Sequence, residues 1–359
     1  MNKIKRILVA GAGGSAAHNF IESLRISPEK FYIVGTDCKK YHVELSGADI
    51  FYEMPRADDK NYIKMLNKLI KKERIDLVHP QPDVEVKRIS DDREKIIDVK
   101  LFLPSKEAID ICQNKFVFNQ KITQAGLKVV QSYYIEDKKS LIKAFRRLKK
   151  DNEKIWIRAI RGAGSKAALP LTKVEHAVSW IQYWIDMKGL TWKDFMISEF
   201  LPGKEYAFQS LWKDGEILMS QARERIEYLF GSLMPSGQSS SPSIAKTVNS
   251  KKVNEAAFKA ILAVDRKASG IYCADIKENK NGNPCVTEIN AGRFFTTSNF
   301  FSFAGINMPY IYVKIALGEK VNLSKFKPFD NLPPDLYWVR MVDMGYKMIK
   351  EGQWKIRKI

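Results

Sequence analysis

Apolar residues in the first hundred positions alternate between short continuous runs and stretches with helical spacing. Residues 6–10 and 31–35 form runs typical of buried strands, and residues 16–24 between them have the amphipathic spacing of a helix. A second helix and a further strand are predicted over residues 62–71 and 76–79. Strands that alternate with helices pair in parallel, so we predict a doubly wound α/β domain at the start of the chain.

The pattern changes near residue 111 from regular alternation to helices mixed with pairs of strands. A strand predicted over residues 154–158 runs directly into a glycine-rich loop, and strand pairs with short turns follow over 206–222 and 270–289. Residues 223–247 are rich in Ser, Gly and Pro, which predicts a mobile loop. The predicted parts are an N-terminal Rossmann-like domain (1–110), an α+β domain of two subdomains (111–195 and 196–325) and a C-terminal extension (326–359).

The chain is strongly basic, with 60 Lys and Arg against 41 Asp and Glu and a formal net charge of +19. Such a charge favours anionic partners. Nucleotide phosphates or an acidic substrate explain it at least as well as nucleic acid, because no finger spacing or basic heptads occur. A lysine-rich solvated surface is the alternative explanation. No run approaches the roughly 18 apolar residues of a membrane helix, so we expect no membrane span and a cytoplasmic protein.

A glycine-rich turn follows the first predicted strand. Gly11, Gly13 and Ala16 have the spacing of a dinucleotide-binding turn, and Asp37 lies at the end of the next strand. This pattern supports an NAD(P)-dependent oxidoreductase as one function. The same glycines also suit the tight turn that any doubly wound domain needs, and the rest of the chain shows no reduction chemistry.

Three oxygen-bearing side chains lie on the last predicted strand pair. Asp275 and Glu288 are thirteen positions apart on strands joined by a short turn, and Asn290 shares a strand face with Glu288. Mg²⁺ prefers carboxylate and carbonyl oxygens and shares its remaining positions with phosphates. The spacing therefore predicts a magnesium site, with an acidic solvated hairpin as the alternative.

Basic and polar residues at other strand ends suggest where anions and amines bind. Arg158 ends a strand before the glycine-rich loop, which suits phosphates although it lacks Walker A spacing. Arg223 and Arg225 lie at the entrance to the predicted mobile loop and suit an anionic substrate, unless they are surface residues. The residues after the strand 76–79 lie at the ligand-binding edge of the first sheet and could receive an amine or form only a rigid turn: Gln81, Asp83 and Glu85.

Taken in order along the chain, these motifs resemble those of the ATP-grasp family over residues 111–320. The resemblance rests on the helix at Lys115, the glycine-rich loop, the segment from Glu199 to Tyr206, and the D-x₁₂-E-x-N pattern. Within that family, the motifs most resemble those of the synthetase half of carbamoyl-phosphate synthase large chains. Two positions depart from the family: Arg158 stands where many members have Lys, and Arg293 is displaced by one position from the usual E-x-N-P-R ending.

The resemblance implies an ATP-grasp fold behind a Rossmann-like domain, with roles for individual residues. Asp275, Glu288 and Asn290 would hold Mg²⁺, as two ions that Mn²⁺ could replace, and Arg293 would steady the transferring phosphoryl group. The implied ATP-binding residues are Lys115, Arg158, Arg161, Gly162, Gly164 and Ser165 for the phosphates, Glu199, Phe200 and Leu201 for adenine, and Glu205 for the ribose.

The function that the resemblance implies is an ADP-forming ligase. It would phosphorylate a small-molecule carboxylate, and an amine or ammonia would attack the acyl phosphate. A glutamine amidotransferase subunit is an expected partner if ammonia is used, and a homodimer is the expected assembly. The alternatives are the NAD(P)-dependent oxidoreductase and a non-catalytic ATP-binding scaffold. Buried carboxylates have no physical reason to persist in an idle site, which favours catalysis.

Overall fold

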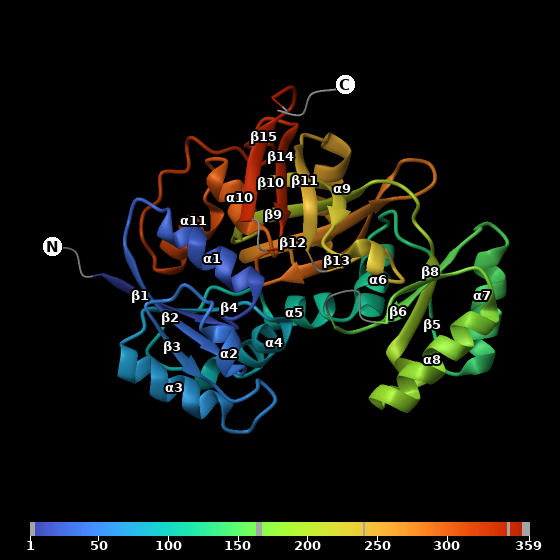
Figure 1. Cartoon of the computed structure of the whole chain (residues 1–359), viewed down its shortest axis with the longest axis horizontal. Coiled ribbons are helices and arrows are strands. Elements are labelled where there is room, and N and C mark those ends of the chain that lie inside the picture. Colours follow the sequence, from blue (N-terminus) through green and yellow to red (C-terminus); the bar gives the residue numbers. More distant parts are fainter. Residues whose placement is uncertain (1–3, 163–166, 240, 343–344, 354–359) are drawn as a thin grey trace.

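Three β-sheets organise the computed structural model, which describes residues 4–162, 167–239, 241–342 and 345–353. A four-stranded sheet holds the first strands of the chain, a second four-stranded sheet stands at the opposite end, and a seven-stranded sheet lies between them (Figure 1). In the described part of the chain, no helix is both long enough and apolar enough to cross a membrane.

The N-terminal sheet is parallel throughout and has the strand order β3-β2-β1-β4. The apolar run of β1 is continuous because both faces are covered: Ile7 and Val9 share a core with α1, whereas Leu8 and Ala10 share one with α3. This confirms the predicted doubly wound architecture. The elements are β1 (Lys5–Ala10), α1 (Ser15–Arg25), β2 (Phe31–Asp37), α2 (Lys40–Val43), β3 (Ile50–Glu53), α3 (Tyr62–Glu73), β4 (Leu77–Pro80), α4 (Asp83–Asp91) and α5 (Lys106–Cys112).

The second sheet is small, antiparallel and has the order β5-β8-β6-β7. Helix α7 begins at a capping box in which Asp137 accepts a hydrogen bond from the Ser140 amide. The apolar residues of α7 and α8 pack on this sheet as a core of their own. The elements are α6 (Lys115–Gln124), β5 (Ser132–Tyr134), α7 (Lys138–Lys149), β6 (Ile155–Ala159), β7 (Leu169–Leu171), α8 (Val174–Lys188) and β8 (Phe195–Glu199).

The large sheet is antiparallel, with the order β13-β12-β9-β10-β11-β14-β15. Its elements are β9 (Glu205–Lys213), β10 (Glu216–Tyr228), β11 (Pro242–Val248), α9 (Lys251–Val264), β12 (Gly270–Glu278), β13 (Pro284–Ala291), α10 (Ser298–Phe303), α11 (Met308–Ala316), β14 (Leu336–Met341) and β15 (Gly345–Lys350).

The prediction of a mobile loop over residues 223–247 was wrong at both ends. Strand β10 continues to Tyr228, and β11 begins at Pro242 and pairs with it. Within this strand Arg223 is buried and Arg225 is half-buried, and Arg225 forms ion pairs with Asp275 and Glu205. Burial of charge in a strand is stable only when such partners are present, and these partners lie far away in sequence.

The predicted C-terminal extension contributes strands to the large sheet. β14 pairs with β11, and β15 pairs with β14 at the sheet edge (Figure 1). Trp338 on β14 is completely buried, with its ring centre 5.4 Å from that of Phe300 in a stacked arrangement. Strand β14 is therefore part of the core rather than of a separate tail.

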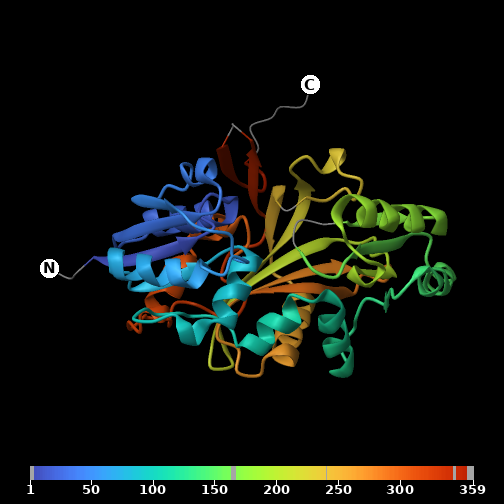
Figure 2. The same ribbon diagram turned by 90° about the horizontal axis from the view of Figure 1, so that it is seen from below.

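The N-terminal sheet and the large sheet share hydrophobic cores, which fixes one against the other. Helix α1 packs on α10 and α11, and Asn307 Nδ2 donates to the Ser23 carbonyl oxygen over 2.6 Å. Asn19 Nδ2 donates to the Thr296 carbonyl oxygen in the same seam. Figure 2 shows the N-terminal sheet alongside the large sheet, with the small sheet beyond. The carboxyl end of β4 consequently faces β13.

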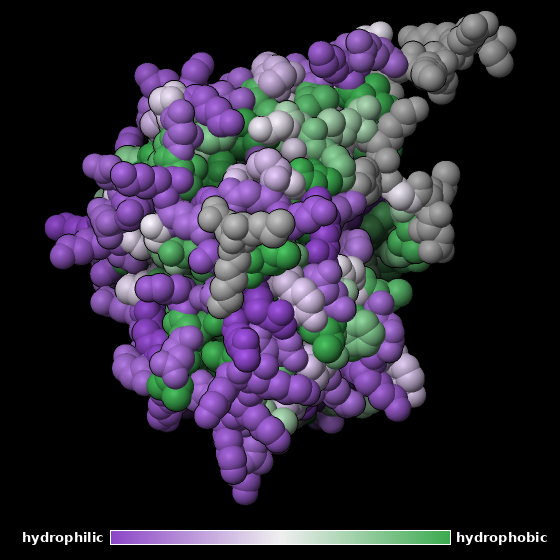
Figure 3. Space-filling view, turned by 90° about the vertical axis from the view of Figure 1, so that its left-hand side faces the viewer, coloured by the Kyte–Doolittle hydropathy of each residue, from purple (hydrophilic) through white to green (hydrophobic). Residues whose placement is uncertain are grey.

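Hydrophilic residues cover most of the face that Figure 3 shows, with apolar residues in scattered groups between them. Such a surface agrees with the high content of Lys and Arg in the sequence.

Candidate functional site

Two carboxylates and an amide converge where β12 and β13 pair. Asp275 lies directly opposite Glu288 in the antiparallel register, so both side chains project from one face of the sheet. Asn290 follows two residues later, and its Nδ2 donates to Asp275 Oδ2 over 2.9 Å. The structure thus brings the three predicted metal ligands together, while their role as ligands stays a prediction.

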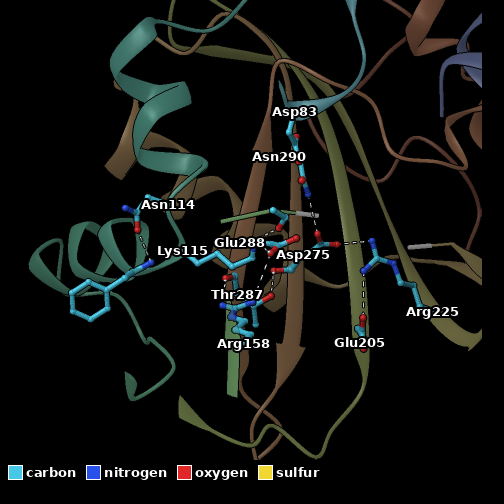
Figure 4. A network of polar contacts seen from close by, with 12 residues as sticks. Asp83, Asn114, Lys115, Arg158, Glu205, Arg225, Asp275, Thr287, Glu288 and Asn290 are labelled. Carbon is cyan, nitrogen blue, oxygen red and sulfur yellow. Dashed lines mark hydrogen bonds and ion pairs between the residues drawn. The ribbon is translucent and has the colours of Figure 1, made fainter. Parts of the chain in front are cut away.

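Two cations reach Glu288 from the side of the small sheet (Figure 4). Lys115 is the first residue of α6, and its Nζ lies 3.2 Å from Glu288 Oε2. Arg158 on β6 places Nη1 3.7 Å from the same oxygen and donates from Nη2 to the Thr287 carbonyl oxygen over 3.0 Å. Asn114 holds the start of α6 by accepting hydrogen bonds from two backbone amides, which fixes where Lys115 begins.

A third cation, Arg225 on β10, bridges two acidic residues on the other side of the cluster. Its Nη2 lies 2.5 Å from Asp275 Oδ1, and its Nη1 lies 3.3 Å from Glu205 Oε1 (Figure 4). Glu205 has three further polar partners: Tyr228, Gln238 and Lys277. The carboxylate predicted to bind the ribose is therefore already held by protein donors, and a ribose hydroxyl would have to replace one of them.

The cations control the ionisation of the carboxylate pair. Burial by itself raises the pKa of Glu288, but Lys115 and Arg158 more than offset it and hold that pKa below its usual range. Burial raises the pKa of Asp275, against the opposing effect of Arg225. Glu288 is therefore a carboxylate at neutral pH, and further positive charge between the two residues would also favour the ionised form of Asp275.

Arg293 connects this cluster to the N-terminal sheet. Its guanidinium donates to the Asp83 carboxylate at the start of α4 and to Asn290 Oδ1. Asp83 lies 210 residues earlier in the chain, at the carboxyl edge of β4. The arginine predicted to steady a phosphoryl group is thus in the cluster, and it brings the edge of the first sheet up to the predicted metal ligands.

The predicted adenine-binding segment lies at the end of β8. Glu199 exchanges backbone and side-chain hydrogen bonds with Gln131, of 3.0 and 2.9 Å. Leu201 is buried in a small cluster with Val130. The ring centre of Phe200 lies 6.1 Å from that of Trp156. Apolar rings and aliphatic side chains suit a flat base, so this end of the site remains a reasonable place for adenine.

The other predicted site residues differ in whether they reach the cluster. Arg161 is exposed after β6, and the Gly162 carbonyl oxygen accepts a hydrogen bond from Lys115 Nζ over 2.8 Å. Gly164 and Ser165 lie outside the described residues. Arg223 is completely buried, and its guanidinium lies 5.1 Å from the ring centre of Phe295.

The environment of Arg223 distinguishes it from its neighbour Arg225. Burial, aided by the charge of Arg225, lowers the pKa of Arg223 to about 9. Arg225, not Arg223, is the arginine of β10 that lines the cavity and contacts the acidic residues.

The glycine-rich turn after β1 is filled by the protein itself. A Cβ at Gly13 would lie 2.6 Å from the backbone of His42, and one at Gly11 would lie 2.2 Å from the ring of Pro82. Asp37, the acidic residue of the predicted dinucleotide-binding pattern, accepts hydrogen bonds from the backbone amides of Gly13 and Lys39. The glycines therefore permit close packing of the chain, which accounts for the pattern without a dinucleotide.

A cavity of about 530 Å³ joins these features. Its walls carry Lys115, Arg158, Phe200, Glu288 and Arg293, together with Gly11 and Gly14 from the first turn. Apolar residues at one end and opposed charges at the other suit a nucleotide with its phosphates near the carboxylates. Two carboxylates with an amide oxygen suit Mg²⁺. Among the described residues, no group of three or more His, Cys, Asp or Glu could hold a metal by itself.

Comparisons with solved structures identify the fold. The chain superposes on an N5-carboxyaminoimidazole synthetase from Staphylococcus aureus complexed with ADP, with a TM-score of 0.70 and 16% identity over 95% of this chain and 84% of that one. The chain has the ATP-grasp fold. This confirms the predicted fold class, in which an N-terminal parallel domain precedes the ATP-grasp sheets.

Two further solved structures have similar folds. One is the biotin carboxylase domain of 2-oxoglutarate carboxylase from Hydrogenobacter thermophilus, in complex with MgADP and bicarbonate, with a TM-score of 0.69 and 15% identity over 94% of this chain and 74% of that one. Another is an L-amino acid ligase from Bacillus licheniformis, with a TM-score of 0.65 and 13% identity over 94% and 79%.

Sequence comparison adds one family. The family described as PylC-like, N-terminal domain, matches residues 7–102, which lie within the parallel domain that precedes the ATP-grasp sheets. The comparison with curated protein sequences gave no match.

Sequence reasoning missed several residues of the site. Lys277 and Tyr228 line the cavity around Glu205, but neither belongs to a motif. The sequence identified Arg223 and Arg225 as a pair. Nothing in the sequence indicated that Arg225, and not Arg223, contacts Asp275. These contacts join separate strands, so no local spacing reveals them.

Proposed function

We propose that the protein is an ATP-dependent, ADP-forming ligase that activates a carboxylate as an acyl phosphate and joins it to an amine or ammonia. The observation that carries the proposal is the arrangement around Glu288. Its carboxylate is shared by Lys115 and Arg158 on one side and lies opposite Asp275 on the other. Cations and carboxylates that face one cavity suit a polyphosphate bound together with a divalent metal.

The first chemical step is a phosphoryl transfer. An oxygen of the substrate carboxylate forms a bond to the γ-phosphorus, and the bond from that phosphorus to the β,γ-bridging oxygen breaks, which releases ADP. Lys115 and Arg158 neutralise charge on the phosphate oxygens, and Arg293 lies where it can stabilise the transferring group. The enzyme needs no covalent intermediate, because positioning and charge stabilisation supply the catalysis.

The second step is acyl transfer to nitrogen. The lone pair of the amine attacks the acyl carbon, phosphate leaves with its bonding electrons, and the nitrogen loses a proton to solvent or a nearby base. Asp275, Glu288 and Asn290 would hold Mg²⁺, which neutralises phosphate charge when it is bound. These oxygens already have positively charged or amide partners, so metal binding exchanges one set of partners for another.

Calorimetric titration of ATP into wild type and Glu288→Gln, with and without Mg²⁺, tests the proposal. With Mg²⁺, the variant should bind ATP at least about tenfold more weakly, because it loses a metal ligand. Without Mg²⁺, the variant should bind ATP as tightly or more tightly, because a negative charge next to the phosphates has been removed. The opposite signs separate a metal ligand from a residue that merely supports the fold.

The matched control is Glu255→Gln, which makes the same change on the exposed side of α9 and should leave ATP binding unaltered. Thermal unfolding of each variant checks that folding is intact. Absence of ATP binding in the wild type, together with binding of NADH or NADPH, would refute the ligase and favour the oxidoreductase. ATP binding without ADP release across panels of carboxylates and amines would favour the non-catalytic scaffold.

Finer features belong to the same proposal. They are the relationship to carbamoyl-phosphate synthase, the use of two metal ions with Mn²⁺ as a substitute, the amidotransferase partner, the homodimer and the cytoplasmic location. The similarity of the fold to an L-amino acid ligase supports an organic amine as nucleophile over ammonia delivered by a partner.

A further inference from the structure

A second cavity, of about 540 Å³, adjoins the first on the side of the N-terminal sheet. The two cavities share wall residues, among them Asp83, Lys115, Glu288 and Asn290. A molecule in the second cavity would therefore meet the first at the carboxylate and cation cluster. The volume far exceeds the roughly 30 Å³ of one water or ammonia molecule, so the cavity has room for an organic substrate.

Glu85 stands in the wall of this second cavity with half of its carboxylate unsatisfied. The residue lies in the first turn of α4 and is only 7% exposed. Its Oε1 accepts a hydrogen bond of 2.8 Å from the Tyr62 hydroxyl, whereas its buried Oε2 has no hydrogen-bond partner. Oε2 lies close to the Gly11 turn, 3.1 Å from where a Cβ at Gly11 would be. A buried carboxylate oxygen without a donor is costly, so a ligand that donates there would be favoured.

Asp37 adds a second carboxylate to the same wall. Its side chain accepts only from the backbone amides of Gly13 and Lys39 among the hydrogen bonds of the described residues. Burial raises the pKa of Glu85 to about 7 although Tyr62 donates to it, and the charge of Asp37 adds to the rise. Both acids line the second cavity, and among the described residues neither forms an ion pair with a cation.

The basic residues around the second cavity are engaged by other acids. Within the described part of the chain, these pairs are Lys87 with Asp91 and Asp110, Arg88 with Asp92, Arg56 with Asp58, Lys115 with Glu288, and Arg293 with Asp83. Arg161 also lines the cavity, but its side chain is exposed. The wall at Glu85 and Asp37 thus carries negative charge that the protein does not compensate.

We propose that this cavity binds the amine-bearing substrate, and that a primary ammonium group of that substrate is held by Glu85 Oε2 and Asp37. This inference rests on the proposed ligase function and names the class of its second substrate: an organic amine rather than free ammonia, whose ammonium group the two acids hold while a second amino group supplies the lone pair that attacks the acyl phosphate. An ammonium group supplies both the donor that Oε2 lacks and the positive charge that the two acids lack. The adjoining cluster then lies at the other end of the bound molecule.

Calorimetric titration of 1,4-diaminobutane tests the proposal, with 1,4-butanediol as the uncharged probe of similar shape and ammonium chloride as the small cation. Wild type should bind the diamine saturably, the diol not at all, and ammonium more weakly than the diamine. Glu85→Gln keeps the shape of the side chain and removes the charge, so it should weaken diamine binding at least about tenfold. Asp37→Asn should weaken it in the same direction, which serves as a second variant.

The control variant Glu94→Gln changes an exposed acid after α4 and should bind the diamine as wild type does. Above pH 7, where Glu85 is ionised, Glu85→Gln should also raise the unfolding temperature of the ligand-free protein, because an uncompensated buried charge is removed. No saturable diamine binding to wild type, equal binding of the diol, or unchanged binding by Glu85→Gln would each overturn the proposal. The titration contains no ATP, so its failure is distinguishable from a failure of Mg²⁺-dependent ATP binding, which would overturn the ligase.

Discussion

The buried imidazole of His79 should make the stability of the fold depend on pH. His79 lies on β4, one residue before its end, and is completely buried between Phe20, whose ring is stacked at 4.1 Å, and Phe294. Its Nε2 lies 2.8 Å from Gln81 Oε1, and its Nδ1 lies 3.3 Å from the Tyr312 hydroxyl. Burial lowers the pKa of His79 from its usual 6.5 to about 4, although the hydrogen bond to Gln81 opposes the shift.

The sign and size of the effect follow from this difference. The unfolded chain takes up a proton at His79 as the pH falls below about 6.5, whereas the folded protein takes it up only near pH 4. Stability that is present above pH 6.5 is therefore lost between pH 6.5 and 4. A difference of this size corresponds to roughly 3 kcal/mol of unfolding free energy.

Urea unfolding of wild type and His79→Gln, measured from pH 7.5 to pH 4, checks this reasoning. Glutamine retains a donor for Gln81 but does not titrate, so the stability of wild type relative to the variant should fall by roughly 3 kcal/mol over that interval. Other titrating groups cancel in the comparison. The Tyr312 hydroxyl donates to the Phe102 carbonyl oxygen, so both ring nitrogens of His79 face acceptor oxygens. If these acceptors outweighed burial and kept the ring charged, wild type would instead gain stability relative to the variant as the pH fell, and the reasoning would be refuted.

Two further predictions concern packing and helix capping. Gly13→Ala should destabilise the fold by about 1–3 kcal/mol in urea unfolding, because the new methyl group would lie 2.6 Å from the His42 backbone. Gly14→Ala, whose new methyl group would have its nearest contact at 3.3 Å, should destabilise the fold much less. Equal losses of stability in the two variants would show that the backbone of the turn moves to accommodate the methyl group. Asp137→Ala should lower the stability of α7 by about 1 kcal/mol, because the hydrogen bond from the Ser140 amide to the Asp137 side chain is lost. The loss should appear as faster amide hydrogen exchange confined to α7, with ATP binding as in wild type. Unchanged exchange would show that the cap does not stabilise the helix.

The sequence predicted the parts of the fold that depend on local pattern. The alternation of apolar runs and amphipathic stretches was sufficient to predict β1, β2 and β4, because these strands are covered on both faces, whereas the edge strand β3, with every second residue exposed, was not predicted. Asp275, Glu288 and Asn290 could be grouped because one short hairpin carries all three. A short connection fixes register, and register fixes which side chains share a face.

Residues joined across large separations could not be found in this way. The contact between Arg293 and Asp83 spans 210 residues, and neither residue has a neighbour in sequence that indicates the pairing. The pairing of β14 and β15 with the large sheet was not predicted, because the cations of these strands mask the buried Trp338. Asp83 and Glu85 were both identified at the sheet edge, but only the structure shows that one is paired and the other is not.

The distribution of the hydrophobic cores bears on how the molecule loses structure. Both larger cores contain residues from the N-terminal sheet and from the large sheet, for example Leu8 with Phe208 and Ile7 with Leu211. The core of the small sheet draws on the small sheet, on the two helices that pack on it and on the segments that connect them, and not on the other two sheets. The chain therefore consists of two cooperative units of unequal size. Loosening the smaller unit would release Arg158 from Glu288 while the carboxylates stay in place on an intact sheet, so a nucleotide could enter and leave without global unfolding.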